Sequence, residues 1–312
     1  MGPGPVMVVA FSFAFCRIAV ATGFVSPKRT VTSTTTTMTT ELRGGYDATV
    51  GTVDPSTPIQ FFTLPGNACP YAQRTHIALL ELNLPFDMTE VMGFPTKPDW
   101  YLKINPRGKV PALRVPTPTI TTENNYDDTD DNNMNMAVIY ESAICNEFLC
   151  DYASTTLLQL HHTLMPTADP IMRANIRLHN DHCDNIFTKA QFTYLMNKDA
   201  TMDDELCTQM ESALLYYENV LKRSKGPYLM GENFTLADIH VFPFIQRLVI
   251  THEHWKNYEL TNDKFPLLLQ WHESCLERES VSVSSMTSDK TIEVYGRFFS
   301  ANYNFGGLNK SK

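Results

Sequence analysis

Residues 64–74, Leu-Pro-Gly-Asn-Ala-Cys-Pro-Tyr-Ala-Gln-Arg, decide how this chain folds. An apolar run at 59–63 precedes them and predicts a strand, and the Pro-Gly-Asn triplet is typical of a turn. Pro70 suits the first position of a helix, where no backbone N–H is needed, and apolar residues then recur at helical spacing. The stretch therefore predicts a strand, a turn and a helix that begins beside Cys69.

The position of Cys69 predicts a nucleophile. Unpaired N–H groups and the helix dipole favour negative charge at a helix N-terminus, so we expect a lowered thiol pKa and a thiolate near neutral pH. The residue three positions later is Ala72, so there is no Cys-x-x-Cys pair. A disulfide formed at Cys69 would need an external thiol such as glutathione to resolve it. The alternative is that Cys69 is a small buried apolar residue.

Composition excludes several classes of protein. The chain has 312 residues, of which 43% are hydrophobic, which is enough for two small domains. The net charge is −9 and no basic run occurs, which argues against a nucleic-acid partner. The seven cysteines lack paired spacing, so we expect neither a disulfide framework nor a metal site. We treat the following histidines as ordinary polar residues, because they lack acidic partners at metal spacing: His161, His162, His179, His182, His252 and His254.

Residues 1–52 differ from the rest and predict a targeting presequence with a linker. Residues 1–23 are signal-like, with an apolar run that is too short for a membrane span and is interrupted by Arg17. Residues 24–40 are rich in Ser and Thr and contain no acid, as in transit peptides. This order resembles the two-part presequences of algae whose plastids lie inside extra membranes, and it predicts a plastid protein with no stable membrane span in its mature form. The alternatives are that the segment is a signal anchor or a disordered tail, and that the protein is cytoplasmic or lies in the endoplasmic reticulum or secretory pathway.

Residues 53–155 predict a small α/β domain, because strands and helices alternate there. Within it, residues 116–135 carry acids among asparagines without periodicity, and predict an exposed insertion between two strands. The calcium-loop spacing is absent from this insertion. The expected strands lie at about 59–63, 86–91, 110–115 and 136–140, and the expected helices at about 69–83, 97–104 and 141–153.

Residues 156–312 predict an all-helical domain. Asp169 followed by a proline is typical of a helix start. Thr235 and Asp238 have the spacing of a capping box, with Asp in place of the usual Glu or Gln. The expected helices lie at about 170–196, 203–224, 236–250, 266–278 and 289–300.

Several ordered motifs over about 58–300 resemble the glutathione transferases, particularly their cysteine-type classes (omega, lambda and dehydroascorbate-reductase-like). Residues 69–74 resemble the active-site turn, 105–113 the segment with the family's cis-proline, and 140–144 the Glu-Ser pair that starts a helix. The resemblance implies an α/β thioredoxin-like domain that binds glutathione, followed by an all-α domain. Monomers and homodimers both occur among these classes.

The resemblance also implies how glutathione binds. Cys69 would be the catalytic residue, with Tyr71 lining the thiol pocket. Pro111, as the cis-proline, would turn the Val110 main chain toward the cysteinyl part of glutathione. Lys97 would meet the glycyl carboxylate.

The Glu-Ser pair would hold the γ-glutamyl end of glutathione. Glu141 would pair with its ammonium, and Ser142 would hold its carboxylate with the hydroxyl and the N–H. Taken alone, each of these motifs is also compatible with a plain turn or a helix cap.

The implied activity is a glutathione-dependent thiol transferase or reductase that uses glutathione as co-substrate and no metal. Candidate second substrates are glutathionylated thiols, dehydroascorbate and glutathionyl adducts. One alternative is a transferase that conjugates glutathione to electrophiles, although that chemistry uses a hydroxyl rather than a cysteine. The other is a non-catalytic carrier of hydrophobic ligands.

Overall fold

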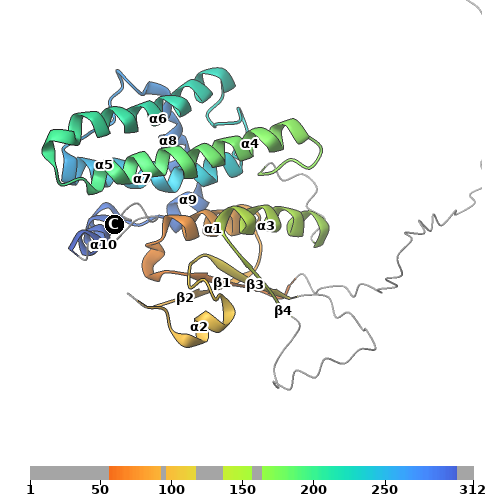
Figure 1. Ribbon diagram of the computed structural model, residues 1–312. Helices are drawn as coiled ribbons and strands as arrows, with labels where there is room; N and C mark the ends of the chain where they lie inside the picture. Colours follow the sequence, from red (N-terminus) through yellow and green to blue (C-terminus); the bar gives the residue numbers. More distant parts are fainter. Residues whose placement is uncertain (1–55, 93–95, 117–135, 157–163, 301–312) are drawn as a thin grey trace, which may run out of the picture. The chain divides into compact units, whose positions relative to one another are not determined.

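The computed structural model describes residues 56–92, 96–116, 136–156 and 164–300 (Figure 1). All of them belong to one compact unit, Ala48–Lys312. The predicted presequence, the acidic insertion after Pro116, and His161 and His162 lie outside the described residues. No helix within the described ranges is long and apolar enough to span a membrane.

A four-stranded mixed sheet forms the first part of the fold, in the order β2-β1-β3-β4. β1 and β2 are parallel, because α1 (Pro70–Glu81) connects them, and the other neighbours are antiparallel. The expected third strand begins two residues late, after the cis peptide bond between Val110 and Pro111. The strands are β1 (Ile59–Thr63), β2 (Phe86–Glu90), β3 (Ala112–Pro116) and β4 (Met136–Tyr140).

The two faces of the sheet are covered by different helices, α1 and α3 (Ser142–Thr156) on one and α2 (Asp99–Ile104) on the other (Figure 1). Successive β1 side chains point to opposite faces. Phe61 therefore packs in the large core with α1 and α3, while Phe62 packs on α2 with its ring 5.5 Å from that of Tyr101. Both faces are buried, as the predicted α/β arrangement requires.

The second part of the fold is helical. α1 packs against α7 and α9, so the sheet and the helices share one continuous core. The elements are α4 (Pro170–His182), a π-helical segment (Cys183–Phe187), α5 (Thr188–Met196), α6 (Asp203–Ser224), α7 (Leu236–Lys256), α8 (Pro266–Leu276), α9 (Glu279–Ser284) and α10 (Ser288–Ser300). The predicted thioredoxin-like sheet followed by helices is confirmed.

The helices differ from the sequence prediction by a few residues at several ends, and in three larger respects. The helix expected over 170–196 is interrupted by the π-helical segment, which the apolar spacing does not reveal. α7 continues past residue 250 until Asn257, whose left-handed backbone (φ 50°) caps it. α9 is an additional helix that follows α8.

The predicted capping box at the start of α7 is confirmed, and Asp238 does more than cap. Its buried carboxylate accepts hydrogen bonds from the N–H and hydroxyl of Thr235, at 2.8 and 3.0 Å. It also accepts from the N–H of Leu229 and the indole N–H of Trp271, both at 2.8 Å. Asp238 therefore joins the α7 start, the preceding loop and α8.

Replacing this carboxylate should destabilise the fold strongly. Asp238→Ala leaves buried donors unpaired and should lower the free energy of unfolding by about 3 kcal/mol, against about 1 kcal/mol for Thr235→Ala, which removes only cap bonds. Urea unfolding followed by tryptophan fluorescence measures both. Equal losses for the two variants would contradict this role of Asp238.

Candidate active site

A cleft of about 1170 Å³ opens beside Cys69, between the sheet's connecting loops and α10. All seven site residues predicted from the sequence line it: Cys69, Tyr71, Lys97, Val110, Pro111, Glu141 and Ser142. They lie in the loops beside the strands and in the first turns of α1 and α3, so the sheet brings together positions that are far apart in the chain. The cleft also contains residues of α10 that the sequence analysis missed.

Cys69 is the N-cap of α1, with an extended backbone, and Pro70 occupies the first helical position as predicted. Its thiol donates to the carbonyl oxygen of Val110 at an S···O distance of 3.7 Å. The preceding turn places Gly66 and Asn67 in left-handed conformations, with φ of 62° and 58°. This turn directs the chain from β1 into the start of the helix.

The predicted lowering of the Cys69 pKa is wrong for this structure. The residue is partly exposed, but its thiol is withdrawn from water, and this burial raises the thiol pKa. The N–H groups of Ala72 and Tyr71 and the cations Arg247 and Lys97 act in the opposite direction. The helix N-terminus is present as expected, but desolvation outweighs it.

Glu141 and Ser142 lie at the start of α3 in unusual settings. Glu141 has a left-handed backbone (φ 72°), a strained conformation for a residue with a side chain. Its carboxylate forms an ion pair with Arg107 at 2.6 Å. The hydroxyl of Ser142 accepts from the guanidinium of Arg74 at 3.2 Å, so its own proton is left for another acceptor.

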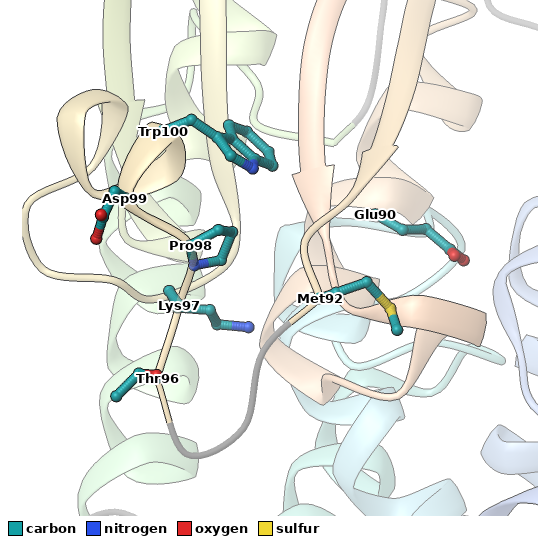
Figure 2. A pocket seen from close by; sticks show the side chains of 7 residues that line it. All are labelled: Glu90, Met92, Thr96, Lys97, Pro98, Asp99 and Trp100. Carbon is teal, nitrogen blue, oxygen red and sulfur yellow. The ribbon is translucent and has the colours of Figure 1, made fainter.

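Lys97 lies between the main cleft and a smaller hollow of about 560 Å³. Figure 2 shows its ammonium pointing toward Met92, while Asp99 points away. The ammonium donates to the carbonyl oxygen of Val91 at 3.2 Å. Burial lowers the pKa of Lys97, and the neighbouring Cys69 acts to raise it. The hollow is lined by Glu90, Met92, Thr96, Lys97, Pro98, Asp99 and Trp100.

Arg74 is a buried residue whose role the sequence analysis did not anticipate. Its guanidinium lies over the rings of Tyr71 and Phe244, at 5.0 and 4.7 Å from their centroids. It forms an ion pair with Asp184 at 2.7 Å, and Asp184 also lines the cleft. Although burial acts to raise it, the pKa of Asp184 is held well below its usual range by Arg74 and His240. Arg74 therefore connects Tyr71, Ser142 and the π-helical segment.

Cys183, Asp184 and His240 place three possible metal-ligand atoms within 4.8 Å of one another. Arg74 already supplies a cation there, because it contacts the Cys183 sulfur at 3.5 Å as well as Asp184. We therefore interpret the cluster as the surroundings of an arginine. Three of the four described histidines that the sequence analysis set aside have hydrogen-bond partners: His179 with Tyr216, His182 with Tyr217, and His252 with the carbonyl oxygen of Gln191. The ring of the fourth, His254, contacts that of Trp255 at 4.5 Å.

α10 contributes one side of the cleft through Lys290, Val294, Arg297 and Phe298. Lys290 forms an ion pair with Glu293 at 2.9 Å, and Arg297 also pairs with Glu293. The sequence predicted this helix but carried no motif that places it beside Cys69. Its packing against α7 brings it there.

Family models and known proteins agree on what this chain resembles. The N-terminal domain model of glutathione S-transferase matches residues 68–152, and the C-terminal domain model matches 182–279. The chain is 25% identical to the chloroplastic glutathione S-transferase DHAR3 of Arabidopsis thaliana, over 72% of this chain and 71% of that protein. It is 24% identical to pyrimidodiazepine synthase of Drosophila melanogaster, over 72% of this chain and 80% of that protein.

A solved structure shows the same fold. The omega 3C glutathione transferase of Trametes versicolor superposes with a TM-score of 0.61 at 24% identity, over 80% of this chain and 94% of that one. Together with the two domain models, which match most of the sheet and most of the helices, these similarities show that the chain belongs to the glutathione S-transferase family.

Proposed function

We propose that the protein is a glutathione-dependent thiol transferase with Cys69 as its nucleophile. The observation that carries this proposal is the cysteine itself, which lies at a helix N-terminus inside a cleft lined by Lys97, Glu141 and Ser142. Glutathione carries two carboxylates and one ammonium, and these three side chains offer complementary charges and donors. The charge pattern and the thiol therefore suit the same ligand.

The reaction proceeds in two exchanges. The Cys69 thiolate attacks the glutathionyl sulfur of a mixed disulfide, a Cys69–glutathione disulfide forms, and the other thiolate leaves and takes up a proton. A second glutathione thiolate then attacks the glutathionyl sulfur, which releases oxidised glutathione and restores the Cys69 thiolate. The net reaction converts a mixed disulfide and one glutathione into a free thiol and oxidised glutathione.

The contacts in the cleft support the binding assignments that the resemblance implies. Glu141 would hold the γ-glutamyl ammonium, with Arg107 keeping its carboxylate in place. Ser142, oriented by Arg74, would donate to the γ-glutamyl carboxylate. Lys97 would meet the glycyl carboxylate, and Val110, next to Pro111, would pair with the cysteinyl main chain after the Cys69 thiol releases its carbonyl. Candidate second substrates are glutathionylated thiols, dehydroascorbate and glutathionyl adducts.

Cys69 is less suited to the alternative of glutathione conjugation. That reaction needs a donor that stabilises the thiolate of glutathione without reacting with it, whereas a cysteine thiolate would exchange with it. A non-catalytic carrier would have no need of a cysteine at this position. Chlorodinitrobenzene conjugation that survives Cys69→Ala would favour the first alternative, and ligand binding without turnover the second.

Removing the thiol should abolish turnover. With the full chain, Cys69→Ala and Cys69→Ser should each lower glutathione-dependent reduction of hydroxyethyl disulfide and of dehydroascorbate by at least about a hundredfold, because no disulfide intermediate can form. Cys207→Ser is the matched control, since Cys207 is a partly buried cysteine on α6 that does not line the cleft. Retained activity in both Cys69 variants would refute the proposal.

Changing the binding residues should weaken glutathione binding more than the chemistry. Lys97→Met and Glu141→Gln should each raise the KM for glutathione by about tenfold or more, as expected for a lost charge-assisted hydrogen bond. Lys103→Met, at an exposed lysine of α2, is the control and should leave KM unchanged. If KM stays constant in the two cleft variants, glutathione binds elsewhere.

We also propose that residues 1–52 direct the protein to a plastid, in keeping with the chloroplastic name of the Arabidopsis relative. A fluorescent protein fused behind residues 1–52 should enter the plastid of an alga whose plastid lies inside extra membranes. A fusion that lacks the signal-like residues 1–23 should stay in the cytosol, because it could not enter the first membrane. Secretion or cytosolic fluorescence of the complete fusion would contradict this location.

A further inference from the structure

Arg247 is a buried cation that no carboxylate of the described residues pairs with. It lies on α7 with 2% of its surface exposed. Within the part of the chain that the structure describes, no Asp or Glu forms an ion pair with it. Removing a charge from water is costly unless a counter-charge accompanies it, and arginine does not escape this cost by losing its proton. The position of Arg247 therefore needs an explanation.

Among the described residues, Arg247 donates hydrogen bonds only to neutral groups. One terminal nitrogen donates to the side-chain oxygen of Gln73 at 2.5 Å and to the carbonyl oxygen of Pro243 at 2.9 Å. The other donates to the carbonyl oxygen of Asn67 at 3.0 Å. The third nitrogen, Nε, has no partner among the described residues. These bonds position the guanidinium but do not balance its charge.

These partners lie on both sides of Cys69. Asn67 is in the turn before it, and Gln73 is in the first turns of α1 after it. Burial lowers the pKa of Arg247, and the groups whose negative forms would favour its charge are Tyr295 and Cys69. Burial raises the pKa of Tyr295 to about 12, so Tyr295 is neutral at physiological pH. Cys69 is the remaining source of a counter-charge.

We propose that Arg247 is a positioning residue whose guanidinium is the buried counter-ion of the Cys69 thiolate. The inference rests on the proposed role of Cys69 as nucleophile. Arg247 holds the two segments that flank Cys69 and keeps an uncompensated positive charge beside them. That charge favours ionisation of a thiol that burial would otherwise keep protonated. It does not line the cleft, so its effect reaches the substrate through Cys69.

Arg74 shows the contrast within the same core. It is equally buried and also joins α1 to α7, but Asp184 balances its charge at 2.7 Å. A guanidinium that only bridges two helices can therefore have a carboxylate partner in this fold. Arg247, where α7 passes the turn before Cys69, has no carboxylate partner within the described ranges.

Among the charged or titratable groups that act on Cys69, Arg247 and Lys97 are the two cations that favour its thiolate. Lys97 is the second cation that favours the thiolate. Three phenols also interact with Cys69, those of Tyr71, Tyr101 and Tyr295, and burial raises the pKa of each, so all three remain neutral near pH 7. Lys97 has access to water in the cleft, whereas Arg247 does not, so the charge of Arg247 is screened less.

The test measures the pKa of Cys69 without any turnover. The full chain is alkylated with iodoacetamide across a pH series, and mass spectrometry of the Cys69 peptide gives the rate at that residue. Arg247→Gln removes the charge and should raise the midpoint of the alkylation rate against pH by about one pH unit. At a pH below that midpoint, alkylation of Cys69 should be about tenfold slower than in the wild type. Arg247→Lys keeps the charge and should remain close to wild type, although it loses hydrogen bonds to Asn67 or Gln73.

A purely structural role would give a different pattern. Arg247→Lys and Arg247→Gln would then both impair folding or activity, while the midpoint of Cys69 alkylation would be the same in both. Equal midpoints in wild type and the two variants would overturn the proposal.

A second variant answers the question if Arg247→Gln does not fold. Gln73→Glu is nearly isosteric and places a carboxylate on the atom that already accepts from Arg247 at 2.5 Å. It should neutralise the guanidinium and raise the alkylation midpoint of Cys69. The amide nitrogen of Gln73 also donates to the hydroxyl of Ser285 at 3.1 Å, and the variant loses this donor, so the alkylation midpoint and not the melting temperature is the measurement that decides. An unchanged midpoint would show that Arg247 has no free charge to offer and would overturn the proposal.

The two proposals fail in different ways. Alkylation needs no glutathione, so a raised midpoint in Arg247→Gln supports the counter-ion even if the wild-type protein reduces no disulfide. Conversely, if the wild-type protein reduces disulfides rapidly and Arg247→Gln leaves the midpoint of Cys69 alkylation unchanged, the proposed function is supported and the role of Arg247 is overturned.

Discussion

The junction between α1 and α7 is the constraint on which the rest of the molecule depends. Two buried arginines cross it in opposite directions: Arg74 of α1 donates to the carbonyl oxygen of His240 at 2.8 Å, and Arg247 of α7 donates to Gln73 and Asn67. Because α1 also packs on the sheet, this junction fixes the turn before Cys69 relative to both parts of the fold. The position of Cys69 is thus set by helices as much as by the strand that precedes it.

This arrangement gives Cys69 two opposing influences. The core that holds the turn in place also withdraws the thiol from water and raises its pKa, whereas backbone N–H groups, Arg247 and Lys97 favour the thiolate. A nucleophile needs its ionised form, so the cations beside Cys69 matter more here than at an exposed helix terminus. Lys97 lines the cleft, whereas Arg247 is enclosed and does not line it.

Local sequence patterns predicted the parts of the structure that local interactions determine. The strand–turn–helix around Cys69 and the capping box at Thr235 were predicted from short motifs and are confirmed. The cis bond before Pro111, which the resemblance to the family implied, is also present. Features that depend on tertiary packing were not predictable. The pKa of Cys69 depends on burial by distant segments, and Arg247 contacts Gln73 across 174 residues of sequence. No motif marks the π-helical segment that carries Asp184, or the side of α10 that faces the cleft.

The central claim is that Cys69 exchanges disulfides with glutathione, and the mass of the intact protein after exposure to oxidised glutathione tests it most directly. The account predicts that the wild-type chain gains one glutathione at Cys69, that reduced glutathione removes it, and that Cys69→Ala gains none at that site. Burial keeps most of the other described cysteines from competing. If the wild-type protein gains no glutathione at Cys69, at any pH up to the pKa of that thiol, the central claim is contradicted.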